Sequence, residues 1–184
     1  MSARDQVLDA YEQLLITDGE RAATMDAVAA LAGVSKGGLL YHFKSKDALV
    51  GGLVARLEAL ADEDMAAMRE APQGASAYYV GGSAYLGTPF DRALVATARL
   101  VQDANPQARE AMQRIQDTWH EIILAEVGDR PIARAIVLLG DGLYYNAALA
   151  GGPWGEAMTT TTQADLESLL DVVALLKQQA AARA

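Results

Sequence analysis

The sequence predicts an all-α protein with about nine helices, and two observations carry this prediction. Hydrophobic residues make up 52% of the chain and are mainly alanine and leucine, which suit helices. No segment shows the strict alternation of apolar and polar residues that a half-buried strand requires. The pattern indicates short helices near the N-terminus and longer ones after them.

The first expected helix covers residues 3–18. Its apolar side chains recur every three or four residues, so they share one face of the helix. Gly19 follows the pattern and predicts the end of the helix. The residues of this apolar face are Val7, Leu8, Tyr11, Leu14 and Leu15.

Three residues that favour helix N-caps follow within a short span. Thr24 is expected to start a second helix that ends at Gly33. Ser35 is expected to start a short third helix. Ser45 is expected to start a fourth helix that runs through Leu60.

Gly51 and Gly52 lie inside this fourth helix, where two glycines cost roughly 2 kcal/mol relative to two alanines. A cost of that size suggests that the pair has a purpose. It predicts either a hinge or a close contact between helices at this point.

Five longer helices are expected over residues 75–86, 90–104, 107–127, 132–149 and 163–182. Pro89 and Pro106 are expected in first turns, where proline costs no helical hydrogen bond. The four threonines at 159–162 are expected to form a loop, and one of them should cap the last helix.

The composition limits the possible classes of function. The chain has no cysteine, which excludes disulfides, thiolate zinc sites and thiol nucleophiles, and we expect neither a cofactor nor a metal. The formal net charge is −9, so any binding of nucleic acid must be local. No apolar stretch approaches the roughly 20 residues that span a bilayer, and no signal-peptide pattern begins the chain, so we expect a cytoplasmic protein.

Residues 25–43 have the pattern of a helix-turn-helix. Two short helices that meet at a sharp angle need a small residue at their closest approach, a residue that tolerates positive φ, and an apolar residue under the corner. Ala29, Gly33 and Val34 supply these three features in order. The segment is therefore predicted to bind DNA.

A local basic surface follows the turn. Residues 36–46 contain three lysines and no acid, which gives this strip a charge of +3. Lys36, Gly37 and Gly38 begin the third helix, and the first residues of such a helix enter the major groove. Lys36 and Leu40 are the candidates for contacting base edges.

The run GLLYHFKSKDAL at residues 38–49 resembles the signature of the TetR family of transcriptional regulators, and the resemblance covers residues 3–53. It implies that Tyr41 and His42 contact backbone phosphates, that Phe43 closes a small core, and that Lys46 meets a phosphate at a helix N-terminus. Alternatively, Tyr41 is a core aromatic, His42 a surface imidazole, and the lysines an ordinary solvated face. The predicted DNA-contact set is Thr24, Ser35, Lys36, Gly37, Gly38, Leu40, Tyr41, His42 and Lys46.

The resemblance also implies a division into a DNA-binding domain at residues 1–48 and a ligand-binding and dimerisation domain at 49–184. A helix-turn-helix of this kind reads a palindromic operator as a two-fold dimer, and the family dimerises through its last two helices. Two apolar stripes are candidates for the interface, although each can instead be intramolecular core. They are Ile132, Ile136, Val137, Gly140 and Leu143, and Leu166, Leu169, Leu170, Val173 and Leu176.

The longer helices carry aromatic side chains with polar tips, which are typical of small-molecule cavities, although ordinary core packing explains each of them equally well. Met112, Gln116, Trp119 and Ile123 are expected to share one face of their helix. Asp141 is the candidate contact for a cationic or hydrogen-bonding inducer, as in multidrug-sensing members of the family. The predicted ligand-binding set is Tyr78, Met112, Trp119, His120, Asp141 and Tyr144, with Tyr79, Tyr85 and Tyr145 as further aromatics nearby.

Two other classes of function compete with a ligand-responsive repressor. An enzyme is possible with a pair such as His120 and Asp141, but the chain has only two histidines and no phosphate-binding glycine loop. A helical protein-interaction module that has lost DNA binding is also possible, although the lysine strip argues against it. An activator rather than a repressor also remains open.

Overall fold

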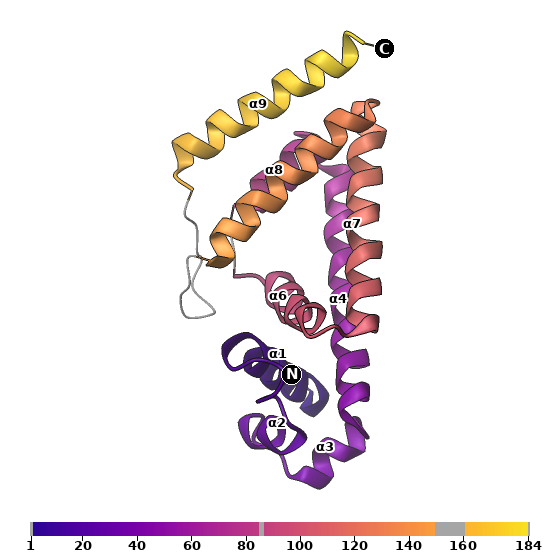
Figure 1. Cartoon of the computed structure of the whole chain (residues 1–184), viewed down its shortest axis with the longest axis vertical. Coiled ribbons are helices and arrows are strands. Elements are labelled where there is room, and N and C mark those ends of the chain that lie inside the picture. The colour runs from indigo at the N-terminus through magenta and orange to yellow at the C-terminus, as the bar shows by residue number, and fades with distance from the viewer. Residues whose placement is uncertain (1, 85–86, 150–160, 184) are drawn as a thin grey trace. The chain divides into compact units, whose positions relative to one another are not determined.

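The computed structural model describes residues 2–84, 87–149 and 161–183 (Figure 1). All the regular structure in these ranges is helical, which confirms the predicted all-α class. No helix within them has both the length and the hydropathy needed to cross a membrane. The helices are α1 (Ala3–Thr17), α2 (Met25–Leu31), α3 (Lys36–His42), α4 (Lys46–Glu70), α5 (Ala75–Gly82), α6 (Pro89–Gln102), α7 (Pro106–Val127), α8 (Arg130–Leu149) and α9 (Gln163–Ala181).

The chain divides into two compact units. The first comprises Met1–Ala61 and Pro89–Arg114, and the second comprises Asp62–Thr88 and Ile115–Ala184. The long helices α4 and α7 therefore each contribute to both units. This division describes packing, and the functional boundary at residue 48 stays a prediction.

Helix boundaries follow the predicted capping residues. The side-chain oxygens of Thr24 and Ser35 accept the backbone N–H groups of Ala27 and Gly38 at 3.2 and 3.0 Å, and both residues are N-caps. Thr162 is the N-cap of α9, as one of the four threonines was expected to be, while Thr159 and Thr160 lie outside the described residues. Local hydrogen-bonding chemistry therefore placed these helix starts correctly.

The core of the first unit forms around α1, which packs against α2, α3 and α6. Val7, Leu8, Tyr11 and Leu15 are fully buried, as the apolar pattern predicted. Glu12 is also fully buried, which the pattern did not predict. A buried carboxylate requires partners, and they come from helices distant in sequence.

Two arginines partner Glu12. The Arg56 guanidinium on α4 lies 2.9 Å from Glu12 Oε1, and Arg92 Nε on α6 lies 3.1 Å from Oε2. Arg56 also pairs with Asp9 at 2.5 Å and Asp5 at 3.5 Å, and these side chains line a cleft of about 380 Å³. Burial raises the pKa of Glu12, although both guanidinium groups oppose this. The network links α1, α4 and α6.

The structure supports one of the two explanations for the glycine pair in α4. The helix is continuous through Gly51 and Gly52. A Cβ atom on Gly52 would lie 2.5 Å from Phe43 Cε1 and 3.2 Å from Leu8 Cδ2, whereas one on Gly51 would meet only Gln107, at an ordinary 3.5 Å. Gly52 thus permits a close approach of α4 to the Phe43 ring.

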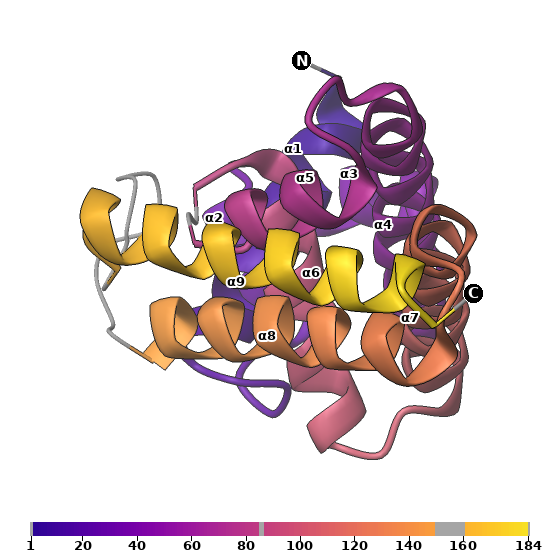
Figure 2. The ribbon, with the colours of Figure 1, turned by 90° about the horizontal axis from the view of Figure 1, so that it is seen from above.

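In the second unit, α8 and α9 run antiparallel and side by side, and both contact α5 (Figure 2). The N-cap of α5, Gly74, has no side chain for capping, and Glu126 on α7 takes its place. Its carboxylate accepts hydrogen bonds from Ser76 N at 2.7 Å and Ser76 Oγ at 2.6 Å, and it pairs with Lys177 on α9. Although burial opposes it, these hydrogen bonds lower the pKa of Glu126.

The two apolar stripes proposed for the dimer interface face largely inward within the second unit. Ile132, Ile136, Val137 and Val173 are buried in the single chain. Gly140 is needed for packing inside the unit, because a Cβ atom there would lie 2.4 Å from Tyr79 Cε1. The intramolecular explanation therefore applies to these residues, since an amphipathic pattern does not say which partner covers it.

Candidate nucleic-acid interface

Helix α3 exposes one face and buries the other. Leu39 and the following Phe43 anchor it in the core of the first unit. On the outer face Leu40 is exposed and Tyr41 is 83% exposed, which rules out the core alternative for Tyr41. The rings of Tyr41 and His42 lie 5.1 Å apart, edge to face. The predicted DNA-contact residues of α3 thus form an accessible surface.

The start of α3 is open to a close approach. A Cβ atom on Gly37 would meet nothing nearer than Ser35 Oγ at 4.0 Å, so the backbone there is bare on its outer side. On Gly38 a Cβ atom would lie 3.3 Å from the same oxygen, so this glycine leaves room for the cap. Thr24 and Ser35 use a lone pair for capping, which leaves each hydroxyl proton free to be donated outward.

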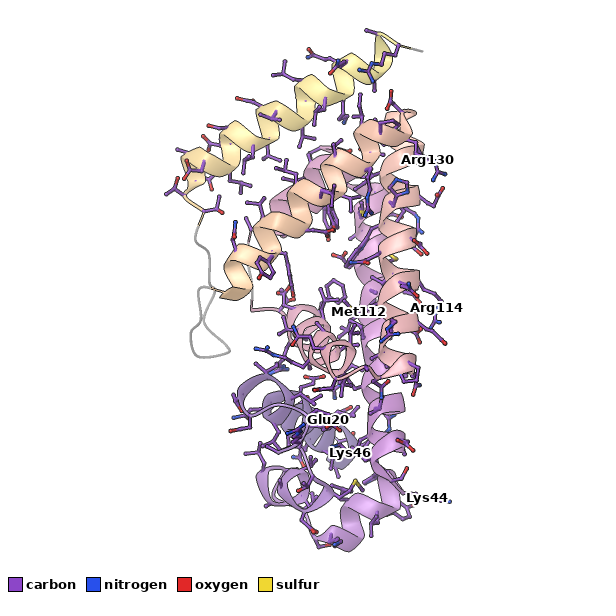
Figure 3. All side chains as sticks on the ribbon, viewed as in Figure 1. Glu20, Lys44, Lys46, Met112, Arg114 and Arg130 are labelled. Carbon is purple, nitrogen blue, oxygen red and sulfur yellow. The ribbon has the colours of Figure 1, made fainter. Side chains whose placement is uncertain are left out.

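Two of the three lysines in the basic strip are paired with carboxylates. Lys36 Nζ lies 2.8 Å from Asp26 Oδ1 on α2. Lys46 Nζ lies 2.5 Å from Glu20 Oε1 and also donates to the Glu20 carbonyl at 2.8 Å, and Figure 3 shows the two residues together. Residues 36–46 keep their charge of +3, but Asp26 and Glu20 beside them reduce the sum for these five side chains to +1.

Lys44 differs from its neighbours. It is exposed, and the described part of the chain gives it no ion pair. The sequence prediction did not single it out, because the family signature names Lys46 and the groove geometry favours Lys36. Its position in the basic strip between Lys36 and Lys46 was the available signal.

The second unit brings together some of the predicted ligand-binding residues. The Tyr79 hydroxyl donates to Asp141 Oδ1 at 2.7 Å, and the Tyr79 ring lies 5.4 Å from that of Trp119. Burial, and then the Asp141 carboxylate, raise the pKa of Tyr79. Tyr79 therefore joins Trp119 to Asp141, although it was named only as a nearby aromatic.

The other members of the ligand-binding set have different surroundings. The Tyr78 hydroxyl donates to Asp64 on α4 at 3.0 Å, and His120 Nδ1 lies 3.7 Å from Glu121. Tyr144 is half-buried on α8. Met112 belongs to the first unit, and Tyr85 lies outside the described residues.

The predicted face of α7 is correct at Trp119 and Ile123 and wrong at Gln116. Ile115, Trp119 and Ile123 are buried, whereas Gln116 is exposed.

The described residues bring together no group of three His, Asp or Glu side chains placed to hold a metal ion.

Two family models match the chain. Residues 7–53 match the model of bacterial regulatory proteins of the tetR family, and residues 82–171 match the tetracyclin repressor-like C-terminal domain. The chain belongs to the TetR family. It is therefore a DNA-binding transcriptional regulator that dimerises and binds a small molecule, rather than an enzyme.

Solved structures share the fold. The multidrug binding protein EbrR in complex with malachite green is 22% identical, with a TM-score of 0.65, over 94% of this chain and 96% of that one. A TetR-family transcriptional regulator from Streptomyces coelicolor is 21% identical, with a TM-score of 0.66, over 97% and 89%. A TetR-like regulator from Rhodococcus sp. RHA1 is 19% identical, with a TM-score of 0.63, over 98% and 96%. No curated protein matches the sequence.

Proposed function

We propose that this TetR-family regulator is a cytoplasmic repressor that binds a pseudopalindromic operator as a homodimer and leaves it when a small-molecule inducer binds. The observation that supports DNA reading most directly is the outer face of α3, where Tyr41 and His42 are exposed while Leu39 and Phe43 hold the helix in place. Such a face offers hydroxyl, imidazole and ammonium donors to DNA.

The proposed contacts divide into two kinds. Lys36 and Leu40 face the base edges and carry sequence preference. Tyr41, His42 and Lys46 contact phosphates, with Thr24 and Ser35 donating their hydroxyl protons and Gly37 and Gly38 allowing close approach. Phosphate contacts give affinity that falls with added salt.

The test is selection of bound duplexes from a random pool, followed by fluorescence-anisotropy titration of the enriched sequence. We expect a palindrome whose affinity falls steeply with salt and is weakened by Tyr41→Ala, a change that removes only an exposed side chain. A folded protein that enriches no sequence at any salt concentration would contradict DNA reading.

The proposed dimer interface uses α8 and α9 but not those stripe residues that are buried within the single chain. Exposed apolar side chains remain on both helices: Leu138, Tyr145, Val172 and Leu175. Leu175 is 62% exposed and Tyr145 is 64% exposed, and several exposed apolar side chains on two neighbouring helices support a contact surface there. Leu175→Glu is expected to shift the protein to monomers in sedimentation equilibrium and to weaken operator binding.

The proposed inducer is a cationic aromatic compound. Trp119 and Tyr79 supply aromatic faces, and Asp141 supplies a carboxylate beside them. EbrR, which has the same fold, binds the cationic aromatic dye malachite green. We expect this dye to release the protein from its operator, and Asp141→Asn to reduce that response while Asp117→Asn, an exposed site, leaves it unchanged.

A further inference from the structure

The two lysines that the proposed function assigns to DNA already form ion pairs with carboxylates in the free protein. Asp26, in the first turn of α2, pairs with Lys36, and both side chains are well exposed at 70% and 62%. Glu20, in the connection between α1 and α2, holds Lys46 through both its carboxylate and its backbone carbonyl. To contact a DNA phosphate, each lysine must therefore either leave its carboxylate or contact the carboxylate and the phosphate at the same time.

These two pairs can be exchanged. The exposed pair of Lys36 and Asp26 contributes little net free energy, and salt screens it. The side chains of Lys46 and Glu20 are 34% and 32% exposed, so a phosphate can still reach this pair, although Lys46 is held more firmly. A phosphate can therefore displace Asp26 or Glu20 from its lysine, but the displaced carboxylate then remains close to a negatively charged backbone. The electrostatic gain from each lysine–phosphate contact is smaller than for an unpaired lysine such as Lys44.

We propose that Glu20 and Asp26 limit the sequence-independent affinity of this regulator for DNA. Binding to arbitrary DNA is almost entirely electrostatic, so two carboxylates on a surface with three lysines remove much of it. Base contacts and shape are not affected in the same way. The two acids thus make operator recognition depend on more than charge, an inference that rests on the proposed DNA-binding function.

The first experiment measures binding to a fixed non-operator duplex by anisotropy over a series of salt concentrations. The variants are Glu20→Gln, Asp26→Asn and the double substitution. We expect about tenfold tighter binding by the double variant, with the slope of log K against log salt steeper by up to about 0.9 for each freed lysine. Unchanged affinity and slope in the double variant would overturn the proposal.

The matched control is Glu63→Gln, which removes one negative charge from an exposed position in the second unit. A gain of less than twofold there shows that position, rather than net charge, decides the effect. An equal gain in Glu63→Gln would contradict a specific role for Glu20 and Asp26. Thermal unfolding checks each variant, and Asp26→Asn keeps the test decisive if Glu20→Gln loses stability, because the Asp26 pair is exposed.

A double-mutant cycle tests whether Glu20 acts through its lysine. Lys46→Ala is expected to weaken non-operator binding more in the Glu20→Gln background than in the wild type, whereas Lys44→Ala should cost the same in both. Equal costs for Lys46→Ala in the two backgrounds would refute the inference. If wild type and all variants bind no DNA, the proposed function itself fails; if they bind DNA but the carboxylates have no effect, only this inference fails.

Discussion

The helix-turn-helix formed by α2 and α3 differs from the second unit in what places its important side chains. In the first, cap oxygens, a left-handed glycine and a short aromatic run act over three or four residues. In the second, Glu126 joins Ser76, which is 50 residues away, to Lys177, which is 51 residues away. Local chemistry decides which α3 side chains are exposed, while long-range packing decides which α8 and α9 side chains are buried.

Ion pairs within the first unit show that the difference concerns range rather than location. The caps around α3 were predictable, but Glu20 lies 26 residues before Lys46 and was not connected with it. Arg56 and Glu12 are 44 residues apart. If this view is right, removing a long-range contact should change stability more than altering a local one, and the following predictions test that order.

The largest effect is expected at Arg56. Arg56→Met leaves the buried Glu12 carboxylate with Arg92 alone, and breaking a buried ion pair costs about 3 kcal/mol. Because burial raises the pKa of Glu12, protonation is favoured in the folded state, and the loss should shrink as the pH falls. Urea denaturation at pH 7 and pH 5 measures the loss of stability and its dependence on pH. The protein concentration is kept fixed, because the stability of a dimer depends on it.

Lys44→Met is the control for Arg56→Met, since it removes an exposed positive charge without an ion pair in the described residues. It should change the free energy of unfolding by less than about 0.5 kcal/mol. A loss at Lys44 as large as that at Arg56 would contradict the importance of the Glu12 network.

The adjacent glycines of α4 provide the next test. Gly52→Ala places a methyl group 2.5 Å from Phe43 and should destabilise the protein by about 2 kcal/mol, as overpacking does. Gly51→Ala has room and should stabilise it by up to about 1 kcal/mol through helix propensity. Thermal unfolding of both variants measures this difference, and equal effects would contradict a specific close contact at Gly52.

Glu126→Gln comes third. The substitution weakens hydrogen bonds to Ser76 and the ion pair to Lys177, at a cost of about 1–2 kcal/mol near neutral pH. Since the pKa of Glu126 lies below its ordinary value of 4.5, its stabilisation is present above that pH and is lost as the pH falls further. Wild type and variant should therefore converge in denaturation curves as the pH falls below 4.5.

Glu110→Gln is the control for this pH effect, because Glu110 is exposed on the same helix. Its curves should follow those of the wild type throughout. A pH-independent gap between wild type and Glu126→Gln would show that shape rather than charge matters at Glu126.

The same contrast explains how much could be predicted from the sequence. The helices and their caps, the positive φ of Gly33 and the exposed residues of α3 follow from propensity, hydrogen bonding and a local motif. The buried Glu12, the Tyr79–Asp141 hydrogen bond and the reason for Gly52 depend on which helices meet. A periodic apolar stripe predicts that another surface buries it, but it does not indicate whether that surface belongs to the same chain or to a second copy.

The smallest expected effect tests the local side of the comparison. Ala104 has a φ of +64° between α6 and α7, a conformation that costs an L-residue roughly 1 kcal/mol and glycine very little. Glycine also loses more entropy on folding, so Ala104→Gly should stabilise the protein by less than about 1 kcal/mol. The N-cap contact that follows, from Ala108 N to Asn105 Oδ1 at 3.0 Å, should survive, because it does not involve the Ala104 side chain. Thermal unfolding that shows a loss rather than a gain would mean that surrounding contacts, and not the backbone, decide even this turn.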